Sequence, residues 1–395
     1  MANPNIAAIS ELHVGTLGFN LKTNGVTLLN TRKLDGSTTT SWDHPTATSI
    51  FGYTATNTLM MVGQSFDFQK TTTSMTYNSN ALTKIYGSEQ ATTQSLQRGS
   101  LYYEINPDIG DYDVSVTMGG SGNFGNVSSF WCNVDQTNPF KTMEGAIYQT
   151  TPSEENSGKY PFTTWSGWTS SQLNYKAEGF RAHLWNMMDQ QCEPGDIGFF
   201  STHMTPATVG LIGGPNTHVI NRADGSASHR DSLQHFAITP DGGKNIVVNS
   251  RFTNFAGGSV NGDSSGKIHS LVVIQSPRTE DTLFACPADR VLKVNSIMAT
   301  NPEATGTYVN VSLAGLGAVN DTAGSAAVTP TGNDAAVRLA QGVKVPMGKP
   351  IELLPRPIYM VEGDSLTANA KSTGFMPQDN QKGVDIVVSF ESMED

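Results

Sequence analysis

The last part of the chain, residues 281–395, alternates apolar and polar residues over several short segments separated by turn-forming residues. Successive side chains of a β-strand point to opposite faces, so a period-two pattern predicts half-buried antiparallel strands. The segments that show it are residues 290–299, 307–313, 337–345, 351–354, 365–370 and 384–390. We therefore expect residues 281–395 to fold as an antiparallel β-sandwich.

The composition favours a mainly β protein with long ordered loops. Charged residues make up 15% of the 395 residues, against about 25% in an average soluble domain, and Gly, Ser, Thr and Asn take their place. The length exceeds that of one ordinary domain. We expect an extended N-terminal arm over residues 1–40, a β-rich central domain over 41–280 and the C-terminal sandwich over 281–395.

Most of the central domain is predicted to be β, with one helix. Strands are predicted over residues 59–68, 101–105, 112–118, 145–149, 209–212, 235–239, 244–249 and 268–274. The helix is predicted over residues 172–190, which end near Pro194 and Gly195, a typical stop signal. Its apolar residues recur at spacings of four, three, four and four, which places them on one helical face. They are Leu173, Ala177, Phe180, Leu184 and Met188.

Residues 314–334 consist largely of Gly, Ala, Thr and Asn and have little to bury. They form either a long surface loop or an arm that becomes ordered against a neighbouring subunit. Because loops of about 20 residues are uncommon inside compact domains, we favour the second interpretation.

The charge and the cysteines exclude several classes of protein. The net charge is −11, and no run of Lys or Arg suggests a phosphate-binding surface, so we expect no direct contact with nucleic acid. Cys132, Cys192 and Cys286 are too widely spaced for a metal pair or a disulfide framework, and we expect small buried apolar residues. No secretory signal and no apolar segment of about 20 residues is present, so we expect synthesis in the cytoplasm of the cell that expresses the chain and no membrane insertion.

Residues 120–125 read GSGNFG and match the dinucleotide-binding fingerprint. That fingerprint requires a following helix, whose N-terminus holds the pyrophosphate. Residues 126–132 instead have the character of a strand. We therefore interpret the match as a hairpin turn.

Three carboxylates, Asp108, Asp111 and Asp113, lie within six residues and are weak candidates for calcium ligands. The Gly and the distal Glu of the helix–loop–helix calcium site are missing, and a solvated turn is the preferred interpretation. The histidines lack the helical spacing of a zinc-protease motif, and no Gly-x-Ser-x-Gly elbow is present. The sequence thus predicts no catalytic residue, metal site or cofactor.

Trp165 and Trp168 are candidates for stacking on a sugar ring, and the alternative is that they fill a core or an interface. The nearby Glu154 and Glu155 do not suggest a glycosidase. Such enzymes need two carboxylates set roughly 5–10 Å apart across a cleft, whereas adjacent residues of an extended chain point in opposite directions.

Short motifs at both ends resemble those of virion structural proteins of tailed bacteriophages, especially marine cyanophage-like ones. The motifs are residues 1–6 (MANPNI), 27–30 (TLLN), 290–297 (RVLKVNSI), 343–346 (VKVP), 357–360 (PIYM) and 362–366 (EGDSL). In that family the matching region is a small β-sandwich of the decoration or collar type. The resemblance covers about 110 C-terminal residues and implies that the central stretch is an insertion or an added domain.

The resemblance and the residue patterns together lead to three functional hypotheses. The first is a non-enzymatic virion protein of the neck, collar, fibre base or capsid surface, which binds itself, favouring a trimer, and other virion proteins. The second is a receptor-binding adhesin that recognises a host surface glycan through the central domain. The third is a hydrolase whose catalytic residues are scattered along the chain.

Overall fold

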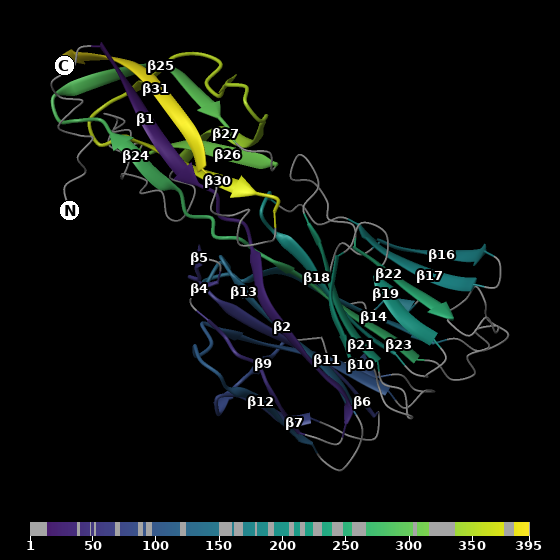
Figure 1. Ribbon diagram of the computed structural model, residues 1–395. Helices are drawn as coiled ribbons and strands as arrows, with labels where there is room; N and C mark the ends of the chain where they lie inside the picture. The colour runs from purple at the N-terminus through teal and green to yellow at the C-terminus, as the bar shows by residue number, and fades with distance from the viewer. Residues whose placement is uncertain are drawn as a thin grey trace, which may run out of the picture. The chain divides into compact units, whose positions relative to one another are not determined.

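The chain forms two compact units in the computed structural model, and only strands occur among the residues described (Figure 1). Unit 1 comprises residues 1–25, 278–374 and 378–395, and unit 2 comprises residues 26–277 and 375–377. The structure describes residues 14–37, 40–47, 49–50, 53–67, 72–85, 90–91, 97–118, 124–149, 160–161, 169–177, 180–188, 193–204, 209–213, 218–223, 231–238, 248–254, 266–302, 306–315, 336–374 and 383–394.

Unit 1 contains two antiparallel sheets. The strands of the first sheet lie in the order β1-β31-β25-β28, and β29 also pairs with β25. They are β1 (Val14–Lys22), β31 (Gly383–Glu394), β25 (Arg290–Thr300), β28 (Ile351–Glu352) and β29 (Ile358–Met360). The second sheet has the order β24-β30-β26-β27. Its strands are β24 (Asp281–Ala285), β30 (Ser365–Ser372), β26 (Thr307–Ala314) and β27 (Ala336–Val345).

One apolar core lies between these two sheets. In β31, Val384, Ile386 and Val388 are fully buried, while the intervening Asp385 and Val387 are exposed. The same core contains Leu292 and Ile297 of the first sheet and Val309, Val311 and Leu366 of the second. The period-two pattern therefore produces the expected β-sandwich, and each predicted C-terminal segment overlaps a strand.

The strand order of unit 1 is that of an eight-stranded jelly roll, when β28 and β29 are counted as one interrupted strand. Strands that follow one another in the chain largely alternate between the two sheets, and the last strand, β31, returns to lie between β1 and β25. In this order β1 comes first and β24 second. Residues 26–277 of unit 2 are therefore inserted in sequence between the first two strands of the jelly roll.

The described residues among the first 40 are divided between the two units. Strand β1 pairs with β31 over nine residues, from Val14 opposite Glu391 to Lys22 opposite Gly383. Figure 1 shows the purple β1 beside the yellow β31. The next strand, β2 (Thr27–Ser37), belongs to unit 2. The sequence did not predict this division because the partner of β1 lies more than 360 residues away in the chain.

The described part of unit 2 contains four larger sheets and one short strand pair. The middle sheet has the order β10-β11-β6-β13-β2, with β9 also on β11, and a small sheet has the order β3-β12-β7-β8. Their bounds are β10 (Gln90–Ala91), β11 (Gln97–Ile105), β6 (Leu59–Asp67), β13 (Phe124–Cys132), β9 (Thr83–Lys84), β3 (Ser41–Asp43), β12 (Asp113–Met118), β7 (Thr72–Tyr77) and β8 (Asn80–Ala81).

The other two sheets are a long sheet, β15-β14-β23-β18-β21-β20, and a four-stranded sheet, β16-β17-β22-β19. The long sheet consists of β15 (Tyr160–Pro161), β14 (Phe140–Gln149), β23 (Gly266–Ile274), β18 (Ile197–Met204), β21 (Asp231–Ile238) and β20 (His218–Ala223). The fourth sheet consists of β16 (Thr169–Ala177), β17 (Phe180–Met188), β22 (Val248–Asn254) and β19 (Val209–Gly213). The short pair is β4 (Ser49–Ile50) and β5 (Tyr53–Thr54).

Three of these sheets stack as layers, with the middle sheet covered on both faces. Leu59 and Met61 of β6 share a core with Phe199 and Val272 of the long sheet. The alternate residues Met60 and Val62 pack into a second core with the small sheet. Both faces of β6 are thus buried, which explains why residues 59–62 form a continuous apolar run rather than an alternating one.

The predicted central segments at residues 59–68, 101–105, 112–118, 145–149, 209–212 and 268–274 all overlap strands. Residues 235–238 lie in β21 and residues 248–249 in β22, and residues 239–247 lie outside the described part of the chain.

The helix predicted over residues 172–190 is not seen, and β16 and β17 form an antiparallel pair in its place. The apolar residues of this segment fit both periods. Phe180, Ala182 and Leu184 alternate with polar residues as a strand does, although Phe180 and Leu184 also fit a helix. The spacing of the apolar residues in this segment therefore does not distinguish a helix from a strand.

Candidate functional site

The three aspartates proposed as calcium ligands each face a different partner. The Asp108 carboxylate accepts hydrogen bonds from the side-chain amides of Asn78 (2.7 Å) and Asn80 (2.9 Å), at the turn between β7 and β8. Asn78 has a φ of 45°, a left-handed conformation that Asn tolerates better than most residues. Asp108 therefore stabilises a tight turn.

The other two aspartates lie at the start of β12 and just before it. Asp113 accepts a hydrogen bond from the Ser41 hydroxyl (2.7 Å). A hydrogen bond between Asp111 and Asp43 raises the pKa of Asp43. Within the described residues no three His, Cys, Asp or Glu side chains form a group suited to a metal ion. These contacts fit the solvated-turn interpretation.

Glu104 on β11 was not singled out by its sequence context. Its Oε2 is buried without a hydrogen-bond partner. Burial, followed by the nearby Asp108 carboxylate, raises the pKa of Glu104 to about 7, although a hydrogen bond with Asn80 acts in the opposite direction. Glu104 therefore changes charge near neutral pH.

Glu104→Gln is expected to be more stable than the unsubstituted protein at pH 8, by on the order of 1 kcal/mol after allowance for partial exposure. The pKa is about 7 in the folded state against 4.5 ordinarily. The contribution of protonated Glu104 to the free energy of unfolding is therefore complete below pH 4.5 and is lost as the pH rises through 7. Urea unfolding between pH 4.5 and 8 measures this change in the free energy of unfolding. Glu362→Gln removes a charge from an exposed position and serves as the control; identical pH slopes for all three proteins would contradict the expectation.

A buried Ser–His contact lies between the small and middle sheets. The Ser128 hydroxyl contacts Nδ1 of His44 and accepts a hydrogen bond from the indole N–H of Trp42 (3.0 Å). Burial, with a further contribution from the Arg32 charge, lowers the pKa of His44 to about 3, so His44 is neutral at pH 7. Neither His44 nor Ser128 is exposed to solvent. A nucleophile must meet its substrate, so this pair joins the two sheets rather than forming a reactive centre.

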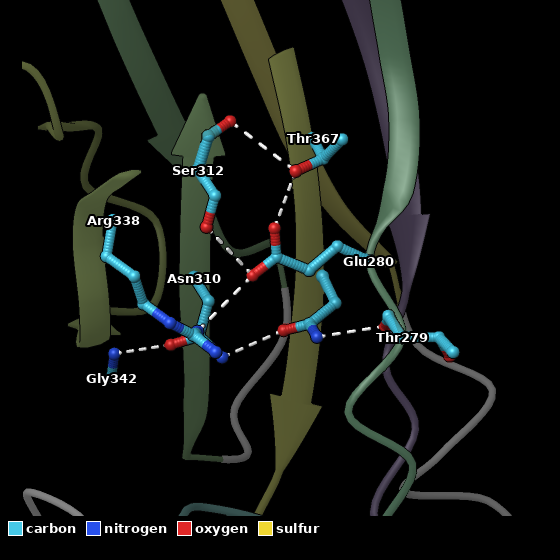
Figure 2. A network of polar contacts seen from close by, with 8 residues as sticks. Thr279, Glu280, Asn310, Ser312, Arg338, Gly342 and Thr367 are labelled. Atoms are coloured by element: carbon cyan, nitrogen blue, oxygen red, sulfur yellow. Dashed lines mark hydrogen bonds and ion pairs between the residues drawn. The ribbon is translucent and has the colours of Figure 1, made fainter. Parts of the chain in front are cut away.

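In unit 1, a polar network covers the side of the second sheet that faces away from the core (Figure 2). Glu280, which immediately precedes β24, lies at its centre. One carboxylate oxygen accepts from the Ser312 hydroxyl (3.1 Å) and from Arg338 (3.3 Å), and the other accepts from the Thr367 hydroxyl (2.6 Å). Glu280 therefore joins β26, β27 and β30 to the segment that enters the sheet.

Two asparagines extend the network along the same face. Asn310 and Asn369 lie opposite one another on β26 and β30, and the Asn310 amide donates to Asn369 Oδ1 (2.8 Å). Asn310 Oδ1 accepts from the backbone N–H of Gly342 (2.6 Å), and the Asn369 amide donates to the Thr279 carbonyl (3.0 Å). Each of these polar groups is satisfied within unit 1, which favours a structural role over ligand binding.

Glu280→Ala is expected to destabilise unit 1 by about 2 kcal/mol, because it leaves three donors without their charged acceptor. Glu394→Ala is a matched control, since Glu394 also contacts an arginine, Arg290 at 3.6 Å, but is 77% exposed. We expect a change below about 0.5 kcal/mol for the control. Thermal unfolding followed by far-UV circular dichroism measures both, and equal effects would show that the network contributes nothing beyond a surface ion pair.

The remaining predicted features have varied outcomes. Cys132 and Cys286 are buried, as expected, and burial raises the pKa of Cys286 to about 11. A strand, β13, follows the GSGNFG segment as expected, but β12 and β13 belong to different sheets, so the hairpin interpretation is wrong. Trp165, Trp168, Cys192 and residues 316–335 lie outside the described residues.

The part of the chain that the structure describes includes no helix long and apolar enough to cross a bilayer. Comparison with protein-family models, with curated proteins and with solved structures gave no match to this chain.

Proposed function

We propose that this protein is a non-enzymatic structural component of a tailed-phage virion that acts by self-assembly and by docking on other virion proteins. The observation that carries the proposal is the strand order of unit 1, since eight-stranded jelly rolls occur in viral capsid proteins. The family resemblance of the C-terminal motifs points the same way and is independent of the topology.

The polar clusters support a structural role. Glu280, Asp108 and Ser128 each bond to neighbouring strands and turns of their own unit. Such contacts fix strands in position, which suits a protein that must present constant surfaces to its neighbours. The neck or collar, the fibre base and the capsid surface are the proposed locations, with a homo-oligomer, favouring a trimer, as the assembly.

The experiment is to purify phage particles from cells that carry this gene and to search them for peptides of this chain by mass spectrometry. The proposal expects the chain to cosediment with intact particles in a density gradient and to remain with them after a salt wash. Recovery of the chain only in the particle-free fractions would overturn it.

A glycan-binding adhesin that acts through the central domain is the second candidate, because Trp165 and Trp168 have side chains suited to stacking on a sugar ring. In that case the purified protein would bind a glycan array, and Trp165→Ala or Trp168→Ala would abolish binding. Absence of binding to any glycan and to host envelope fractions would remove this candidate without affecting the first.

A further inference from the structure

Strand β1 is an edge strand without the usual protection against pairing with another chain. Among the described strands it pairs only with β31, along one side. Residues 14–21 contain no charged residue and no proline, and only the last residue, Lys22, is charged. Native proteins normally block long edge strands with charges, prolines or bulges, because the free N–H and C=O groups of an edge recruit additional strands.

The opposite edge of the sandwich is protected in these ways. Strand β27 at the edge of the second sheet carries Arg338 and Lys344, and its pairing with β26 is interrupted by register shifts. In the first sheet the edge opposite β1 is formed only by the short strands β28 and β29. Strand β24, which ends the second sheet, has five residues and exposes Asp281. Among the described strands of unit 1, β1 is thus the long edge strand that lacks these features.

The side chains of β1 leave apolar surface incompletely covered at this edge. Leu17 and Phe19 point toward the core but are only partly buried. The Phe19 ring stacks on Phe284 of β24, with 6.2 Å between ring centroids. Between them, Gly18 points to the opposite face, where a Cβ atom would meet nothing within 4 Å.

We propose that β1 pairs with β1 of a second copy in an antiparallel arrangement whose two-fold axis passes through Gly18. In this register Leu17 of each copy lies opposite Phe19 of the other, so the partly buried residues cover one another. Thr16 lies opposite Asn20, and Val14 opposite Lys22. The first sheets of the two copies become one continuous sheet, which is the closed, self-complementary contact expected of a dimer.

The size and charge of the contact suit a second copy of the chain. Nine paired residues span about 30 Å, and a sandwich edge is roughly 20 Å thick, so each copy contributes about 600 Å². The two copies together bury about 1,200 Å², which reaches the lower end of the range for specific protein–protein interfaces. Each copy carries a net charge of −11 and repels the other, whereas residues 14–22 contain no acidic residue. We therefore expect added salt to strengthen the contact.

The test uses opposite charges at the two-fold axis. Gly18→Lys and Gly18→Glu each place two like charges directly opposite one another, which disfavours pairing. The space around Gly18 allows either side chain without disturbing the fold, which circular dichroism checks. Light scattering should give the unsubstituted protein twice the 42.2 kDa chain mass, or an even multiple such as a pair of trimers joined by this contact. Each Gly18 variant measured alone should have the smaller molar mass that results when the β1 contact is lost. An equimolar mixture of the two variants should regain the larger molar mass of the unsubstituted protein.

Thr16→Lys is the control, because it places a similar charge two residues from the axis, opposite Asn20, and should retain the assembly. An unsubstituted monomer, an unchanged mass for both Gly18 variants, or a mixture that fails to reassemble would each overturn the proposal. A trimer that is indifferent to both Gly18 substitutions would overturn the β1 contact and leave the proposed virion role standing.

Discussion

Acidification from pH 6.5 to pH 4 is expected to destabilise unit 2 by about 3 kcal/mol through His44 alone. His44 is fully buried and its pKa is about 3 in the folded state against 6.5 ordinarily. The unfolded chain therefore binds a proton across this range while the folded protein does not. The contribution of neutral His44 to the free energy of unfolding is complete above pH 6.5 and is lost as the pH falls toward 3.

His44→Asn separates this effect from other acidic groups, because it retains a polar group near Ser128 but cannot be protonated. The variant is expected to be less stable at pH 7, by about 1–3 kcal/mol, and to lose less stability on acidification. Urea unfolding followed by tryptophan fluorescence reports on unit 2, since all five tryptophans belong to this unit and Trp42 bonds to the same hydroxyl. Parallel losses in both proteins between pH 6.5 and pH 4 would contradict the role of His44.

Phe284→Ala is expected to destabilise unit 1 by about 3–5 kcal/mol. Phe284 is fully buried, and its ring lies 6.2 Å from that of Phe19 and 6.4 Å from that of Phe390. Its removal opens a cavity where β1, β24 and β31 meet. Tyr359→Ala is a matched control, because Tyr359 is 60% exposed and should change stability by less than about 0.5 kcal/mol.

Two optical probes distinguish the units in this experiment. All five tryptophans, at positions 42, 131, 165, 168 and 185, belong to unit 2, whereas circular dichroism reports both units. For Phe284→Ala we expect an early transition by circular dichroism and an unchanged transition by fluorescence. An equal shift of both signals would show that the jelly roll and the inserted unit unfold as one.

The sequence predicts strands well where one face is buried and the other is exposed. Buried and more exposed side chains alternate along strand β31, and the position of this strand could be predicted to within a few residues. Strand β6 is buried on both faces, and its strand assignment rests on its length and flanking residues. The 172–190 segment fitted two periods equally, and only its pairing partner, β22, favours the strand. Local sequence contains no information about such a partner.

The contacts that define the candidate sites depend on residues far apart in the chain. Glu280 meets Ser312 and Thr367, which are 32 and 87 residues away. His44 meets Ser128 across 84 residues. The raised pKa of Glu104 results from burial that no spacing in the sequence reveals. The jelly-roll order likewise depends on the pairing of β1 with β31, at opposite ends of the chain.

The proposed role is that of a structural protein that assembles with copies of itself. The molar mass of the purified protein, measured by light scattering at two concentrations and with and without EDTA, tests this role directly. We expect a defined oligomer whose mass is unchanged by EDTA. A monomer of 42.2 kDa at both concentrations, or an oligomer that EDTA dissociates, would contradict it.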